Sequence, residues 1–282
     1  MPKSQPPQVL ALAIDVDGTL LDPNHEVTAA SRGAIDALKA AGVLPVITTS
    51  RPPAAIATLQ SQLDLADRPA VTCQGAIWGT RDGDGTFHIR SARPIRLASA
   101  RQITRIAEAR GFGVSWFCAD QWLARTNDGL VAQEERITAT TAERVPTLMD
   151  HQPTPNKILV MAEPGREPDL AGVQALLPPD VVGATSRSDY LEIVAVGVSK
   201  WSALREVYAW RQIPLDRTAA IGDGNNDFEM IRNSAVGIAM GHAPATLRQT
   251  ADWIAPDNSH EGFATAVQWL LNAGGTLQQG RQ

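Results

Sequence analysis

Residues 9–22 read VLALAIDVDGTLLD, and the apolar run from Leu10 to Ile14 predicts a short buried strand. The run is far shorter than the roughly 20 residues that a transmembrane helix needs. It ends at Asp15 and Asp17, and a carboxylate that leaves water must be paired or bind a metal. Ligands also bind at this end of a strand in open α/β sheets. Taken alone, the pattern is equally typical of a polar turn in which Asp17-Gly18 supplies the bend.

The chain on either side of a central stretch alternates between strands and helices. Before that stretch, we expect a helix between Thr28 and Gly42, a strand at 43–47, a helix from Pro52 to about Leu65 and a strand at 70–73. After it, we expect a helix at 200–211, strands at 218–221, 236–239 and 253–254, and helices ending near 233, starting at Pro244 and spanning 261–271. This alternation predicts an α/β fold with a doubly wound, Rossmann-like parallel sheet.

The central stretch follows a different pattern. A hairpin at 77–89 with an Asp-Gly turn leads into it. We then expect a helix at 98–109, strands at 113–117, 121–125, 157–162, 181–185 and 190–194, and a helix near 169–176. Strands joined by short turns, with helices between them, predict an inserted α+β domain with an antiparallel sheet. The predicted boundaries are 1–90 for the first part of the core, 91–187 for the insert and 188–282 for the second part of the core.

Composition excludes several classes of partner. The 282 residues carry a formal net charge of −5 with no basic stripe, which argues against nucleic acid. No apolar run is long enough to span a membrane, and the first predicted strand leaves no room for a signal peptide. We therefore expect a cytoplasmic protein without a membrane partner, in which Cys73 and Cys118 are buried thiols rather than a disulfide. The oligomeric state is not predicted.

Polar side chains are concentrated where the core strands end or the following helix starts. They are Asp15 and Asp17, Thr49 and Ser50, Lys200, and Asp223, Asn226 and Asp227. Because the carboxyl ends of parallel strands lie at one edge of a sheet, we expect these groups to converge. Carboxylates gathered there need a cation, and oxygen ligands favour Mg²⁺ over zinc.

A metal, carboxylates and an ammonium together predict phosphoryl-transfer chemistry. Lys200 and the region around Thr49 could hold the phosphoryl oxygens while a carboxylate attacks phosphorus and forms an aspartyl-phosphate. We expect Asp15 to be this nucleophile, because it also binds the metal. Asp17 would protonate the leaving oxygen and later activate water.

Four segments carry a family resemblance. DVDGT at 15–19, TTSR at 48–51, GVSKWSAL at 197–204 and GDGNND at 222–227 resemble the four motifs of the haloacid dehalogenase superfamily. The long insert and the run LEIVAVGVSK at 191–200 resemble its Cof-type branch, whose members carry a large α/β cap of type IIB. The resemblance covers nearly the whole chain, although the cap matches by layout more than by residues.

The resemblance implies a role for each matched residue. Asp15 would be nucleophile and Mg²⁺ ligand, and Asp17 would be the acid/base that also gives the metal its backbone carbonyl. Asp223 and Asp227 would complete the metal site. The phosphate or substrate would contact Val16, Thr49, Ser50, Lys200 and Asn226. Four positions depart from the family pattern, namely Ser50, Gln74, Trp201 and His242, which indicates an atypical substrate.

The sequence therefore predicts a Mg²⁺-dependent phosphatase of a small phosphorylated metabolite, such as a sugar phosphate. A phosphomutase is the first alternative, because it shares the aspartyl-phosphate and returns the phosphoryl group to a sugar. A non-catalytic protein that binds a phosphometabolite on the same scaffold is the second.

Overall fold

The computed structural model describes residues 9–119, 121–125 and 129–272. By its internal contacts the chain divides into two compact units. The described parts of residues 1–48 and 204–282 form the first unit, and residues 49–203 form the second. The first unit is thus built from two separate stretches of chain. The expected domain boundaries at residues 90 and 187 stay a prediction.

The first unit contains a parallel sheet, in which β14, β13, β12, β1 and β2 lie side by side in this order. The bounds are Ala11–Ile14 for β1, Leu44–Thr48 for β2, Thr218–Gly222 for β12, Val236–Ala239 for β13 and Trp253–Ile254 for β14. Strand β1 is fully buried, and its Ala13 pairs with Val46 on one side and Ala220 on the other. Because the strands are parallel, β1 and β12 end at the same edge of the sheet. The predicted doubly wound core is confirmed.

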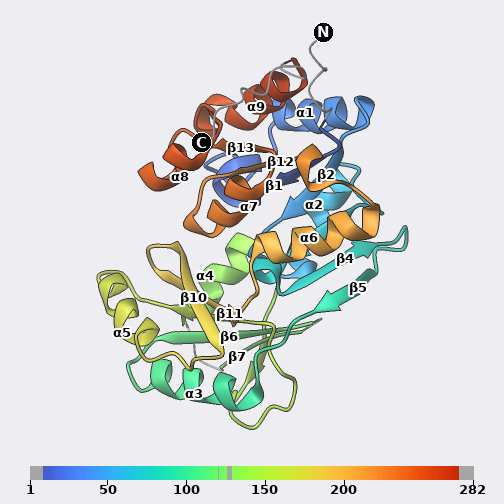
Figure 1. The fold of residues 1–282 in the computed structure, drawn as a ribbon. Helices are drawn as coiled ribbons and strands as arrows, with labels where there is room; N and C mark the ends of the chain where they lie inside the picture. The colour runs from blue at the N-terminus through green and yellow to red at the C-terminus, as the bar shows by residue number, and fades with distance from the viewer. Residues whose placement is uncertain (1–8, 120, 126–128, 273–282) are drawn as a thin grey trace. The chain divides into compact units, whose positions relative to one another are not determined.

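Helices flank this sheet in the first unit. They are α1 (Ala29–Ala40), α7 (Phe228–Asn233), α8 (Ala245–Thr250) and α9 (Gly262–Asn272). The hydroxyl of Thr28 caps α1 by accepting a hydrogen bond from the backbone N–H of Ser31 at 3.0 Å. The helix ends before Gly42, whose φ of 75° suits a residue without a side chain. Figure 1 shows α1 and α9 side by side, and residues of the two helices are in contact.

The second unit contains a hairpin and a six-stranded sheet. The hairpin region comprises β3 (Pro69–Thr72), β4 (Ile77–Arg81) and β5 (Phe87–Ala92), which pair antiparallel. The sheet runs in the order β10-β11-β9-β6-β7-β8. Its bounds are Gly113–Cys118 for β6, Gln121–Arg125 for β7, Glu143–Val145 for β8, Lys157–Met161 for β9, Val181–Arg187 for β10 and Tyr190–Ala195 for β11.

The remaining helices belong wholly or partly to the second unit. They are α2 (Ala57–Gln62), α3 (Leu97–Glu108), α4 (Gly129–Thr138), α5 (Leu170–Gln174) and α6 (Lys200–Arg211), of which α6 ends in the first unit. Within the described ranges, none of the helices combines the length and the apolar character that a bilayer span requires.

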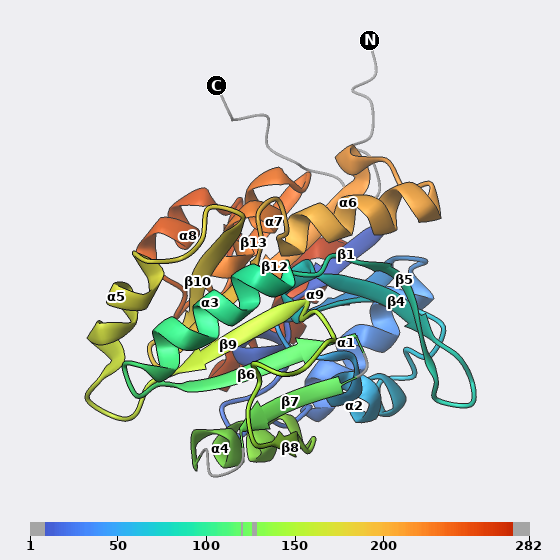
Figure 2. The same ribbon diagram turned by 90° about the horizontal axis from the view of Figure 1, so that it is seen from below.

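The two faces of the six-stranded sheet pack against different partners. On one face, Trp116, Ile158 and Ile193 pack against α3 and α5, and Figure 2 shows α3 lying across these strands. On the other face, Phe117 and Leu159 pack against the turn between β3 and β4. The alternation follows from the two-residue period of a strand.

Several features of the second unit differ from the sequence-based expectations. The pair β7–β8 is parallel within an otherwise antiparallel sheet, and neither β8 nor α4 was predicted. Strand β8 has only three residues, too few for a recognisable period. The helix expected from Pro52 begins as a short 3₁₀ turn and becomes α-helical only at Ala57.

Both cysteines are buried, as predicted, and this has a chemical consequence. Burial raises the pKa of the Cys73 thiol to about 12. Because the thiolate is the reactive form, we expect iodoacetamide at about pH 8.5 to alkylate Cys73 at least about a thousandfold more slowly in the folded than in the unfolded protein. Mass spectrometry of peptides after timed labelling measures this. Rapid labelling of Cys73 in the native protein would contradict the prediction.

Candidate active site

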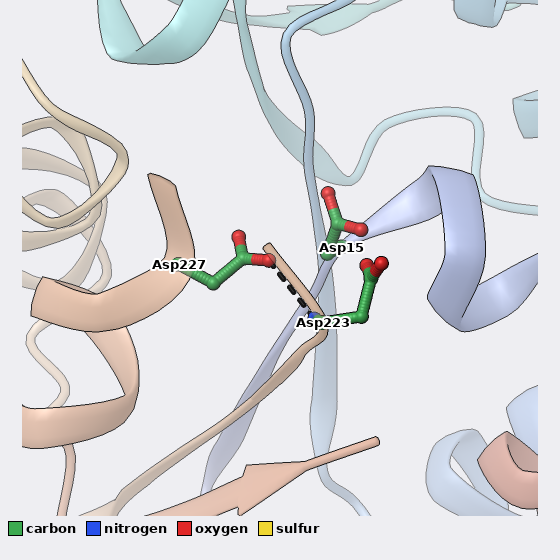
Figure 3. Close-up of side chains that lie close together, drawn as sticks. All are labelled: Asp15, Asp223 and Asp227. Carbon is green, nitrogen blue, oxygen red and sulfur yellow. Dashed lines mark hydrogen bonds between the residues drawn. The ribbon is translucent and has the colours of Figure 1, made fainter. Parts of the chain in front are cut away.

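Three carboxylates meet at the carboxyl ends of β1 and β12. Asp15 directly follows β1, while Asp223 and Asp227 follow β12 (Figure 3). One oxygen from each of the three lies within 4.8 Å of the others. Asp15 and Asp227 are only 5% and 1% exposed. The sequence predicted this convergence, and the parallel arrangement of β1 and β12 produces it.

Backbone hydrogen bonds orient the carboxylate of Asp227. One of its oxygens accepts from the backbone N–H of Asp223 at 3.1 Å and from that of Gly224 at 2.9 Å. The first of these bonds is drawn in Figure 3. Asp227 therefore also fixes the backbone of the loop that carries Asp223.

The turn after β1 shapes the surroundings of Asp223. Gly18 has a φ of 82°, and a Cβ at this position would overlap the Asp223 carboxylate. A side chain is thus excluded both by backbone conformation and by space. The hydroxyl of Thr19 donates a hydrogen bond to Asp223 at 3.1 Å. We did not predict a role for Thr19, although its place in the DVDGT motif was a signal.

The donor set fits a hard divalent cation. Carboxylates at this spacing, two of them buried, repel one another when ionised, and a cation removes that repulsion. Oxygen ligands suit Mg²⁺, which proteins usually hold through one or two carboxylates together with water and substrate phosphates. Asp15, Asp223 and Asp227 are therefore the side chains that would hold it.

The carboxylate of Asp17 is oriented differently. It lies 3.2 Å from Nδ1 of His25, and both side chains are partly exposed. It does not belong to the cluster formed by the other three carboxylates. A partly exposed carboxyl group next to the cluster can exchange protons with a reacting molecule, which suits the acid/base role predicted for it.

A second histidine contacts the cluster directly. Nε2 of His242 lies 3.4 Å from an oxygen of Asp223. The hydrogen bond with that carboxylate raises the pKa of His242. In the sequence, His242 stands out only as a departure from the family pattern, and its contact with Asp223 depends on how the loop after β13 folds.

In the second unit, Thr49, Ser50 and Lys200 come close to one short turn, Cys73–Gly75. The backbone N–H of Gln74 donates to the carbonyl of Thr49 at 3.1 Å. Gly75, with a φ of 94°, lies so close to the start of α6 that a Cβ would overlap the carbonyl of Ser199. Lys200, the first residue of α6, is 1% exposed. One turn therefore links the loop after β2 with the residue that begins α6.

The other predicted substrate contacts lie in the first unit. The side chain of Val16 is fully buried, so any contact with a substrate would come from its backbone. Asn226 is partly exposed in the turn before α7. The approach of Thr49, Ser50 and Lys200 to Asp15 stays a prediction.

Comparison with known proteins identifies relatives along nearly the whole chain. A sequence profile described as haloacid dehalogenase-like hydrolase matches residues 12–267. A 5-amino-6-(5-phospho-D-ribitylamino)uracil phosphatase of Bacillus subtilis is 26% identical over 263 residues, covering 92% of this chain and 95% of that protein. A pyridoxal phosphate phosphatase of Escherichia coli is 24% identical over 275 residues, covering 91% and 96%.

Solved structures share the fold. A haloacid dehalogenase-like hydrolase from Bacteroides thetaiotaomicron superimposes with a TM-score of 0.80 at 20% identity, covering 93% of this chain and 99% of that one. A structure described as a subclass IIB sugar phosphatase superimposes with a TM-score of 0.81 at 21% identity, covering 92% and 98%. These structures thus share the fold of this chain over nearly its whole length.

Proposed function

The chain belongs to the haloacid dehalogenase-like hydrolases, and we propose that it is a Mg²⁺-dependent phosphatase that acts on small phosphorylated metabolites through an aspartyl-phosphate at Asp15. The observation that carries the proposal is the cluster of Asp15, Asp223 and Asp227, with one oxygen of each within 4.8 Å of the others. The relatives named as phosphatases support the reaction class.

Mg²⁺ would be held by the carboxylates of Asp15, Asp223 and Asp227 and by the backbone carbonyl of Asp17. When bound, it supplies positive charge that neutralises and orients the phosphoryl group. The phosphoryl oxygens would also be held by Lys200, by the loop at Thr49 and Ser50, by Asn226 and by the backbone of Val16.

Asp15 performs the first displacement. A bond forms between one of its carboxylate oxygens and phosphorus, while the bond between phosphorus and the leaving oxygen breaks. The leaving oxygen takes the electron pair of that bond and a proton from the carboxyl group of Asp17. The dephosphorylated alcohol then departs, and phosphate stays on Asp15.

Asp17 directs the second displacement. Its carboxylate, now without the proton, accepts one from a water molecule as the water oxygen forms a bond to phosphorus. The bond between Asp15 and phosphorus breaks, which releases inorganic phosphate and restores both carboxyl groups. Dividing a very slow hydrolysis into two displacements lowers the barrier of each.

We propose a phosphorylated metabolite of about sugar-phosphate size as the substrate. The relatives include phosphatases named for a phosphorylated ribityl compound, for pyridoxal phosphate and for sugars. The inserted domain would act as a lid that excludes water and selects the leaving group.

Phosphate release across a panel of sugar phosphates, nucleotides and cofactor phosphates tests the proposal. We expect Mg²⁺-dependent release from at least one class, and removal of the metal with EDTA to lower the rate by roughly 10²- to 10³-fold, because metal stabilisation of the transition state amounts to several kcal/mol. Added Mg²⁺ should restore the rate. Turnover that is unchanged by EDTA would contradict the metal assignment, and an isomerised sugar phosphate as product would indicate a phosphomutase.

A further inference from the structure

Lys157 is a buried ammonium on the six-stranded sheet, outside the residues assigned so far. It begins β9, is 1% exposed, and its Nζ lies 2.7 Å from a carboxylate oxygen of Glu192 on β11. The same Nζ lies 4.4 Å from the centre of the Phe117 ring. Burial lowers the pKa of Lys157, but Glu192, with smaller contributions from Cys73 and Glu134, raises it, so that the pKa is raised overall. The ammonium therefore keeps its charge.

The third contact of this ammonium is with a residue outside the six-stranded sheet. Its Nζ donates a hydrogen bond of 2.8 Å to the backbone carbonyl of Ser50, in the loop that follows β2. Lys157 lies on the face of the sheet that packs against the turn between β3 and β4. The side chain thus spans from the inserted sheet to the loop that carries Thr49 and Ser50.

With this contact, three successive carbonyls of the loop have a donor. The carbonyl of Thr49 accepts from the N–H of Gln74, and that of Arg51 accepts from the N–H of Cys73 at 2.9 Å. The carbonyl of Ser50, between them, is held by Lys157. Two of these donors are backbone groups of the neighbouring turn, and only the middle one is a side chain. The orientation of the Ser50 peptide therefore depends on Lys157.

Stability alone does not account for this arrangement. A buried ion pair often contributes no more to folding than apolar side chains of similar volume would. The pair also occupies a face of the sheet that is otherwise largely apolar, with Phe117 and Leu159 beside it. What an apolar side chain could not replace is the hydrogen bond to Ser50.

We infer that Lys157 is a positioning residue of the reaction, which fixes the Ser50 peptide so that the Thr49–Ser50 loop is preorganised to bind the phosphoryl group. The inference rests on the proposed function, in which this loop binds phosphate. Glu192 keeps the ammonium of Lys157 charged and oriented toward the carbonyl of Ser50. Two buried residues of the six-stranded sheet would thereby contribute to phosphate binding.

The test compares variants that remove the contact with Ser50. Lys157→Met alone leaves the Glu192 carboxylate buried without its cation, which is strongly destabilising. Lys157→Met/Glu192→Gln removes both charges and therefore carries the test if the single variant fails to fold. We expect the double variant to bind inorganic phosphate, measured by calorimetry with Mg²⁺ present, about 10- to 100-fold more weakly than the wild type, because small misplacements of binding groups have effects of this size. Its affinity for Mg²⁺ should be unchanged.

A variant in α3, which packs against the opposite face of the sheet, provides the matched control. Thr104→Val removes the buried hydrogen bond of 2.9 Å from Trp116 to Thr104, which does not touch the loop. It should lower the melting temperature and leave phosphate affinity unchanged. Lys157→Arg keeps a charge for Glu192 and an N–H for Ser50, so it should recover part of the affinity.

The outcomes separate the inference from the proposed function. If the folded double variant binds phosphate within twofold of the wild type, or if Thr104→Val loses as much affinity, the positioning role is overturned while wild-type phosphatase activity still stands. If the wild type neither binds phosphate nor releases it from any ester, the proposed function itself fails.

Discussion

Asp15→Asn is expected to lower kcat for phosphate-ester hydrolysis by roughly 10⁴-fold or more, the loss typical when a nucleophile of a catalytic unit is removed. An amide oxygen is a much poorer nucleophile than a carboxylate, so the bond to phosphorus would not form. Acid quenching of the wild type during turnover, followed by mass spectrometry, should detect phosphate on Asp15. The variant should show no such adduct.

The control for this variant is Asp36→Asn, on the exposed side of α1. Asp36 forms a surface ion pair with Lys39 at 2.9 Å and belongs to no part of the candidate site. Its replacement makes the same chemical change and should leave kcat and the melting temperature nearly unaltered, because surface ion pairs contribute little. Wild-type turnover by folded Asp15→Asn would disprove the aspartyl-phosphate mechanism.

Asp17→Asn is expected to lower kcat for alkyl phosphates by about 10²- to 10⁴-fold, the usual contribution of a general acid and base. Its effect should depend on the leaving group. A nitrophenyl phosphate releases a stabilised anion that needs little protonation, so the first displacement should proceed. The second displacement needs a base for water, so phosphorylated Asp15 should accumulate.

The measurement that separates the two steps is rapid mixing with a nitrophenyl phosphate. Asp17→Asn should release about one equivalent of nitrophenolate per enzyme in a burst and then turn over slowly, which is the kinetic sign of an accumulating covalent intermediate. Equal losses for alkyl and aryl esters, without a burst, would show that Asp17 does not transfer the proton.

Much of the core could be predicted from local patterns. The buried run before Asp15 forms β1, and the residues chosen as the ends of the first helix, Thr28 and Gly42, flank α1. These features follow from hydrophobic period and capping, which depend on neighbours in the sequence. The grouping of Asp15 with Asp223 and Asp227 was also predictable, because parallel strands end at one edge of a sheet.

Other features have no local signal. The three residues of β8 depend on pairing with β7, which lies about 20 residues earlier in the sequence. The contact between His242 and Asp223 depends on the path of a loop.

The sequence by itself determined which carboxylates form the candidate site, because DVDGT places Asp15 after a buried strand and GDGNND supplies Asp223 and Asp227. Only the tertiary structure decided which distant residues hold the loops of the candidate site in place. The bond from Lys157 to the carbonyl of Ser50 joins residues 107 positions apart. In the sequence, Lys157 looks like an exposed polar residue at the start of an apolar strand, although it is buried. The positioning role that we infer for Lys157 depends on two groups that only the fold brings near it, the carboxylate of Glu192 and the carbonyl of Ser50. A buried ammonium is tolerated only when such partners surround it.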